Sequence, residues 1–139
     1  MKKIYVAGPF FSEQEKNDIK RMISYIQQTN PRADLFIPME HFVPGGNARD
    51  EQGRYVMNNA EWGRRVFDMD VAGIDECDEM YVLYYGLYSD TGTAWETGYA
   101  FAKGMPITLF VPNDDINISS LMVHNSARVV IANKLIEQK

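Results

Sequence analysis

The feature that most constrains the fold of this chain is a nearly continuous apolar run, EMYVLYYG, at Glu79–Gly86. A strand with one solvated face alternates apolar and polar residues, whereas a strand that is covered on both faces does not. The run is therefore typical of a strand in the middle of a parallel sheet. Such a sheet needs helices on both of its faces, and it needs other strands on either side.

Strand-like and helix-like segments alternate along the rest of the chain. Strands are predicted at Lys3–Ala7, Ala33–Met39, Glu79–Gly86, Ile107–Val111 and Ala127–Ala132. Helices are predicted after the capping box Ser12–Glu15, at Asn59–Asp75, from Thr93 to Gly104, and briefly before the last strand. The glycine-rich segment Phe42–Asn58 is too long for a simple connection, which indicates a lid or binding loop.

This alternation predicts an α/β fold of the flavodoxin-like, doubly wound class. Right-handed crossovers favour a five-stranded parallel sheet in the order 2-1-3-4-5, with helices on both faces. No linker, repeat or low-complexity tract divides the chain, so residues 1–139 are predicted to form a single domain.

Composition excludes several classes of protein. The formal charge of −5 argues against a partner that is a nucleic acid polymer, because such partners need basic patches. The single cysteine, Cys77, lies among acidic residues that disfavour a thiolate, and it suits a reducing compartment. Neither a signal peptide nor a membrane-spanning run is visible, so we expect a cytoplasmic protein without a membrane partner.

The predicted topology also locates a binding site. In doubly wound sheets the ligand crevice lies beyond the carboxyl ends of the strands, where the winding reverses. Here that point falls between the first and third strands, which brings Tyr5–Phe11 beside Tyr85–Glu96.

Two acidic residues follow the third predicted strand. Glu96 completes the pattern T-x-x-E with Thr93, so it is either a capping-box residue or a carboxylate that the helix N-terminus aims into the crevice. Asp90 is either a turn residue or a partner for a heterocycle. Both alternatives remain open for each residue on spacing alone.

Asp70 lies on an apolar helix face, one turn from Val66 and one turn from Ile74. A carboxylate buried there without a partner would be costly, so we expect it to be paired or to line a cavity. The phenol of Tyr5, inside the first strand, also needs a partner, and Glu96 is the nearest candidate.

No metal or cofactor is predicted. His41 and His124 are isolated and lack the paired spacing of metal ligands. Neither G-x-G-x-x-G nor G-x-x-x-x-G-K follows the first strand, which excludes dinucleotide and P-loop sites. Phe10 and Phe11 follow that strand instead, where they could stack on a flat ligand.

Four segments together resemble the nucleoside 2-deoxyribosyltransferase family: IYVAGPFF, FDMDVAGIDECD, DTGTAWETGYA and SSLM, over Ile4 to about Met122. The resemblance implies transfer of a 2-deoxyribosyl group between free nucleobases, with Glu96 as nucleophile and Tyr5 positioning it. It further implies that Asp70 and Asp90 contact the base and assist its protonation, and that Phe10 and Phe11 line its pocket.

The same resemblance implies a homo-oligomer, dimer-based and up to a hexamer, whose sites lie at subunit interfaces and receive Met122 from a neighbour. The motif glycines Gly8 and Gly92 are expected to contact substrate. Where many members have N-L-M this chain has Ser120-Leu121-Met122, so Asn117 or Ser120 would take the asparagine's role. Phe42 replaces a glutamine that often follows the second strand.

Two other functions are compatible with the sequence. A related group hydrolyses the glycosidic bond of deoxynucleoside 5′-monophosphates and carries a serine- and arginine-bearing loop after the first strand, where this chain has only Ser12. The second of these functions is that of a nucleotide-sensing module, which would bind a nucleoside without turnover. A phospho-receiver would need an acidic pair where the chain has Ala7-Gly8-Pro9.

Overall fold

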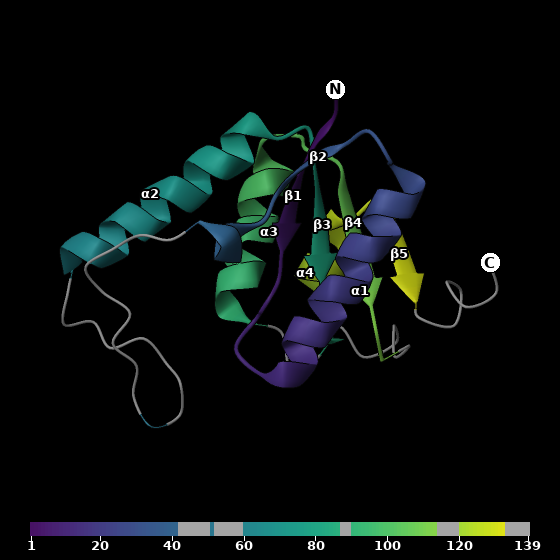
Figure 1. Cartoon of the computed structure of the whole chain (residues 1–139), viewed down its shortest axis with the longest axis horizontal. Coiled ribbons are helices and arrows are strands. Elements are labelled where there is room, and N and C mark those ends of the chain that lie inside the picture. Colours follow the sequence, from purple (N-terminus) through teal and green to yellow (C-terminus); the bar gives the residue numbers. More distant parts are fainter. Residues whose placement is uncertain (42–50, 52–59, 87–89, 114–119, 133–139) are drawn as a thin grey trace.

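The computed structural model describes residues 1–41, 51, 60–86, 90–113 and 120–132 (Figure 1). Within these residues ten elements follow one another: β1 Lys3–Ala7, α1 Glu13–Thr29, β2 Asp34–Phe36, the 3-10 turn η1 Pro38–Glu40, α2 Ala60–Glu76, β3 Glu79–Leu83, α3 Thr91–Ala102, β4 Ile107–Val111, α4 Leu121–Ser126 and β5 Val129–Ala132.

The strands form one parallel sheet in the order β2-β1-β3-β4-β5, which confirms the predicted fold class and strand order. β1 pairs with β2 on one side and with β3 on the other, where Tyr5 is opposite Met80. The winding therefore reverses between β1 and β3, so the crevice expected at that point has β1 and β3 as its floor.

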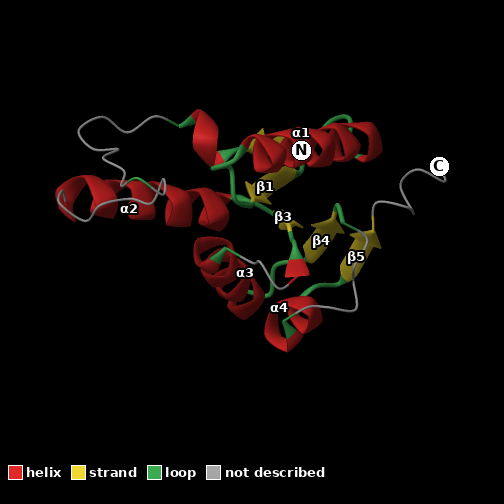
Figure 2. Ribbon diagram, turned by 90° about the horizontal axis from the view of Figure 1, so that it is seen from below, coloured by secondary structure: helices red, strands yellow, loops and turns green. Residues whose placement is uncertain are grey.

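Helices cover both faces of the sheet, with α1 on one face and α2, α3 and α4 on the other (Figure 2). Alternate residues of β1 face opposite ways. Ile4 and Val6 pack under α1, whereas Tyr5 and Ala7 join the core beneath α2 and α3. This alternation places the Tyr5 side chain on the same side of the sheet as Glu96.

Three strand boundaries differ from the prediction. β2 is three residues long rather than Ala33–Met39, because the chain turns into η1 at Pro38, which has no N–H to donate to a sheet. β3 stops at Leu83 instead of Gly86, and β5 begins at Val129 instead of Ala127. The bounds predicted for β1 and β4 are confirmed.

The capping box that opens α1 is confirmed. The hydroxyl of Ser12 accepts a hydrogen bond from the Glu15 N–H at 3.1 Å, and the Glu15 carboxylate accepts one from the Ser12 N–H at 2.8 Å. The lid or binding loop predicted at Phe42–Asn58 lies outside the described residues, apart from Glu51, and stays a prediction. No helix in the described part of the chain is long and apolar enough to cross a bilayer.

Candidate active site

Glu96 lies in the second turn of α3, and its carboxylate does not cap the helix. The N-cap is Asp90, whose side chain accepts hydrogen bonds from the Thr93 N–H at 2.9 Å and the Thr93 hydroxyl at 3.0 Å. The capping-box interpretation of Thr93 and Glu96 was therefore wrong. α3 begins two residues earlier than predicted, because Asp90 is itself a favoured N-cap residue.

The hydroxyl of Tyr5 donates a hydrogen bond to Oε2 of Glu96. Burial raises the pKa of Glu96 from 4.5 to about 7, the hydrogen bond from Tyr5 opposes that rise, and the charges of Asp70 and Asp90 add to it. Burial and the neighbouring carboxylates raise the pKa of Tyr5 well above its ordinary value. The phenol consequently remains a hydrogen-bond donor at any physiological pH.

Stacked rings hold Tyr5 in this position. Its ring stacks on Phe36 of β2, with centroids 5.3 Å apart and planes inclined by 11°, and Phe36 stacks on His41 at 4.3 Å. The rings of Tyr5, Phe36 and His41 thus form a column. Gly73 of α2 leaves room for it, since a Cβ at that position would lie 2.5 Å from carbons of the Phe36 ring. The column fixes the direction in which the Tyr5 phenol points.

Asp70 of α2 lines two cavities, in agreement with what its apolar surroundings predicted. Among the described residues, its buried Oδ1 has no hydrogen-bond partner. Burial raises the pKa of Asp70 from 3.8 to about 6, and the nearby His41 opposes the rise. Two carboxyl groups that retain protons at unusually high pH therefore lie at one site, an arrangement found in many acid–base catalysts.

The first cavity, here called the edge cavity, has a volume of about 300 Å³ and lies beyond the carboxyl end of β1, between the segments that follow β1 and β2, α2 and the start of α3. Phe10 and Phe11 stack on one another at its wall, with ring centroids 5.2 Å apart. Its lining brings together most of the predicted site residues, namely Gly8, Phe10, Phe11, Asp70, Asp90, Gly92 and Glu96. Gly8 also permits close packing, because a Cβ there would lie 2.7 Å from Cβ of Leu83.

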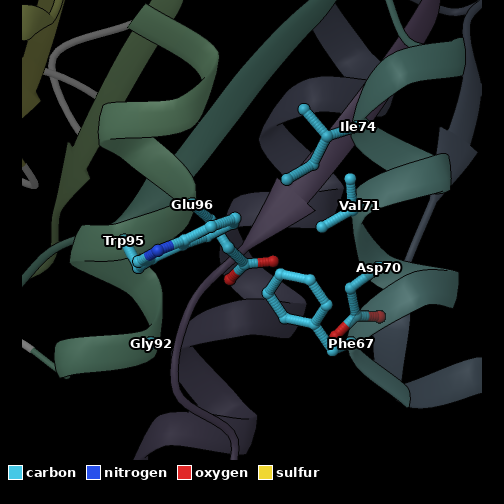
Figure 3. Close-up of a pocket in the computed structure, with 7 residues that line it drawn as sticks. All are labelled: Phe67, Asp70, Val71, Ile74, Gly92, Trp95 and Glu96. Atoms are coloured by element: carbon cyan, nitrogen blue, oxygen red, sulfur yellow. The ribbon is translucent and has the colours of Figure 1, made fainter. Parts of the chain in front are cut away.

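The second cavity, here called the interhelix cavity, has a volume of about 330 Å³ and separates α2 from α3 (Figure 3). Asp70, Gly92 and Glu96 line both cavities. The other lining residues were not predicted: they are Phe67, Val71, Ile74 and Trp95. Phe67, Val71 and Ile74 lie at helical spacing around Asp70, and that spacing could have identified them.

Among the described residues, three of the predicted site residues line neither cavity: Tyr5, Ser120 and Met122. Tyr5 reaches the site through its hydrogen bond to Glu96. The hydroxyl of Ser120 caps α4 by accepting from the Val123 N–H, and its own N–H donates to the Tyr84 hydroxyl. Met122 is 83% exposed and lines a separate groove between α3 and α4. Asn117 lies outside the described residues.

Two observations bear on metal binding and on the cysteine. Within the described ranges, no group of three or more histidine, cysteine, aspartate and glutamate side chains could hold a metal ion. Burial raises the pKa of Cys77 to about 11, so its thiol is a poor nucleophile at neutral pH.

Known proteins match this chain over most of its length. A family model described as nucleoside 2-deoxyribosyltransferase matches residues 4–131. A nucleoside deoxyribosyltransferase of Lactobacillus leichmannii is 26% identical over 117 residues, which span 82% of this chain and 73% of that protein.

Solved structures show the same fold. A 2-deoxyribosyltransferase of Bacillus psychrosaccharolyticus superposes with a TM-score of 0.74 at 29% identity, covering 93% of this chain and 85% of that one. A CMP N-glycosidase of Clostridium botulinum gives a TM-score of 0.61 at 20% identity, covering 99% of this chain and 96% of that one. At 20% identity, that second likeness concerns the fold alone.

Proposed function

This chain belongs to the nucleoside 2-deoxyribosyltransferase family, and we propose that it exchanges the nucleobase of a 2′-deoxyribonucleoside through a covalent deoxyribosyl intermediate on Glu96. The observation that carries the proposal is the buried carboxylate of Glu96, which Tyr5 hydrogen-bonds and which shares two cavities with Asp70. The substrates would be deoxyribonucleosides and free nucleobases.

Glu96 suits the part of nucleophile. Breaking an N-glycosidic bond develops positive charge at C1′ of the sugar, and a carboxylate in a water-poor site both stabilises this charge and captures the carbon. The hydrogen bond from Tyr5 favours the ionised carboxylate and holds one oxygen, which leaves the other oxygen to form the bond to C1′. A second base then attacks C1′, so two displacements retain the configuration of the sugar.

Asp70 suits the part of proton donor to the departing base. Its Oδ1 accepts no hydrogen bond from the described residues, and its raised pKa favours the neutral carboxyl. The pKa values, about 6 for Asp70 and about 7 for Glu96, favour Glu96 as the holder of a single shared proton. The reactive form carries this proton on Asp70.

The edge cavity suits a flat aromatic base. Phe10 and Phe11 offer ring faces for stacking, and Asp90 lies at the same wall as Glu96. Gly92 keeps that wall open, because a Cβ there would approach the Asp90 carboxylate to 3.2 Å. We assign Asp90 to contact with the base or the sugar beside it.

A second copy of this chain is proposed to complete the site. Leu121 and Met122 are 79% and 83% exposed, an unusual degree for large apolar side chains. They project beside a groove of about 240 Å³ whose floor on α3 includes Ala94 and Gly98. A two-fold partner would bury both, and it would bring a further Met122 and Ser120 toward a neighbouring site.

The structure disfavours the hydrolysis of a 5′-monophosphate as the main activity. The backbone N–H groups of Phe11 and Ser12, which could otherwise bind a phosphate at the start of α1, donate to the Glu15 carboxylate at 3.1 and 2.8 Å. The Ser12 hydroxyl is engaged in the same cap. A carboxylate in that place repels a phosphate.

The test is an exchange assay in which a purine deoxynucleoside is incubated with a second free base. We expect the deoxynucleoside of the second base to form, and we expect Glu96→Gln to abolish its formation in a protein that remains folded. A failure to form exchanged nucleoside with any of several purine and pyrimidine acceptors would rule out the transferase. Release of base from a 5′-monophosphate without exchange would favour the hydrolase.

A further inference from the structure

The interhelix cavity offers a second approach to Glu96, from the helical face of the molecule rather than from the sheet edge. An aromatic row, which we call the aromatic seam, runs along it and consists of Phe67 of α2 with Trp95 and Tyr99 of α3. In Figure 3 the indole of Trp95, the Glu96 carboxylate and the ring of Phe67 are seen next to one another. These two rings border the cavity, whereas Tyr99 lies outside it.

The seam is continuous across the two helices. The rings of Phe67 and Trp95 meet edge to face with centroids 5.3 Å apart, and Trp95 stacks on Tyr99 at 5.4 Å. At the far end the Tyr99 hydroxyl donates to Asp75 of α2 at 2.7 Å, and Lys103 forms an ion pair with the same carboxylate. α2 and α3 are therefore joined at two places, at Phe67 with Trp95 and at Asp75 with Tyr99 and Lys103.

The cavity wall is poor in groups that could hold water. Five of its seven lining residues are apolar or glycine, and the two polar ones are the carboxyl groups of Asp70 and Glu96. Water in a cavity needs two to four polar partners, and among the lining side chains only the two carboxyl groups can supply them. Burial is also the largest cause of the raised pKa of Glu96, so the carboxylate is already short of water.

Water is the competing acceptor in the proposed reaction. A base that occupies the edge cavity blocks the approach along the sheet edge, but it does not block the interhelix cavity. Because the two cavities share Asp70, Gly92 and Glu96, water that passed the seam would arrive beside the sugar. The rings of Phe67 and Trp95 meet at the rim of that space, where both side chains are about half exposed, at 46% and 48%, and their apolar surfaces border the path by which water would reach it.

On the basis of the proposed function, we propose that the aromatic seam, through Phe67 and Trp95, excludes water from the deoxyribosyl–Glu96 ester and so sets the ratio of base transfer to hydrolysis. In the hydrolytic step the oxygen of water bonds to C1′ and the bond from C1′ to the Glu96 oxygen breaks. The water loses a proton to a carboxylate of the site. The products are free deoxyribose and the regenerated enzyme.

The experiment measures free deoxyribose and exchanged nucleoside in the same reaction, over a series of acceptor concentrations. We expect Trp95→Ala and Phe67→Ala each to raise the ratio of hydrolysis to transfer by about tenfold, which corresponds to about 1.4 kcal/mol of differential barrier. Trp95→Phe and Phe67→Leu, which keep an apolar group at the rim, should lie close to the wild type. They also supply a test if an alanine variant does not fold.

Tyr99→Phe is the matched control, because it removes the hydrogen bond to Asp75 and leaves the stacked ring in place. Its ratio should equal that of the wild type, since it loosens the helix pair without opening the cavity. Unchanged ratios in both alanine variants, or an equal rise in Tyr99→Phe, would overturn the seam's role. A wild type that forms neither exchanged nucleoside nor deoxyribose would refute the proposed function itself, and the seam's role with it.

Discussion

The hydroxyl of Tyr5 donates a hydrogen bond to the carboxylate of Glu96, although 91 positions of the chain separate the two residues. The contact joins the middle of β1 to the second turn of α3, and it exists because β1 and β3 are neighbours at the point where the winding reverses. It leaves one Glu96 oxygen held and the other available for chemistry.

Removal of this donor tests its contribution. Tyr5→Phe should lower kcat/KM by about ten- to a hundredfold, because a hydrogen bond to a charged group contributes about 1.5–3 kcal/mol. It should also raise the pKa of Glu96 further. Because the higher pKa of the pair sets the alkaline limb of the pH profile, that limb should move to higher pH. Tyr81→Phe, on the opposite face of the sheet, is the control and should retain wild-type kinetics. An unshifted alkaline limb in Tyr5→Phe would contradict the assignment.

The pH dependence of kcat/KM should report both carboxyl groups of the free enzyme. Activity requires ionised Glu96 and protonated Asp70, so kcat/KM should rise up to about pH 6 and fall above about pH 7. The result is a narrow bell with its maximum between these values, whose two limbs belong to the pair rather than to single residues. Asp70→Asn should abolish the alkaline limb and lower the rate, and a wild-type profile that still climbs at pH 9 would contradict the model.

Stability should depend on pH through Glu96. Its folded pKa of about 7 exceeds its ordinary value of 4.5, so the folded state holds the proton more tightly. The resulting stabilisation is complete below pH 4.5 and is lost as the pH rises through 7, by up to about 3 kcal/mol. Glu96→Gln should therefore unfold at higher denaturant concentration than the wild type at pH 8 and at a similar one at pH 4. Equal midpoints at both pH values would show that the side chain is not buried as described.

Much of this arrangement could be predicted from the sequence. The strand order follows from the alternation of elements, and the partnership of Tyr5 with Glu96 follows from that order and from the need of a buried phenol for an acceptor. The start of α3 was missed because two capping patterns overlap there, and only the structure shows that Asp90 caps the helix. The contact between Phe67 and Trp95 depends on how α2 packs beside α3, and the spacing of residues within one helix does not predict that packing.

The column of rings behind Tyr5 also yields a prediction. Gly73→Ala would drive a Cβ to 2.5 Å from the Phe36 ring, so it should lower the free energy of unfolding by about 1–3 kcal/mol and disturb Tyr5. Phe36→Leu in the same chain should restore part of both stability and activity. Gly98→Ala on α3 meets nothing within 4 Å and should be stabilising or neutral in denaturant unfolding. Additive losses in the double variant would show that Gly73 and Phe36 do not act together.

Assembly can be tested at Met122. If a second copy covers the groove between α3 and α4, sedimentation should show a dimer or a larger even assembly, and Met122→Glu should shift it toward monomer. Activity should fall in parallel at low protein concentration, because the site would lose the neighbour's side chains. A wild type that sediments as a fully active monomer would exclude a shared site.

The central claim is that Glu96 forms a covalent bond to the sugar, and the most direct test is to trap that intermediate. A nucleoside that carries fluorine at C2′ is suitable, because the fluorine slows release of the sugar from the enzyme. Mass spectrometry of the digested protein should then find the fluorinated sugar on the peptide that contains Glu96, and Glu96→Gln should show no adduct. Attachment to another residue, or base release from the fluorinated nucleoside with no adduct at any time point, would contradict the role assigned to Glu96.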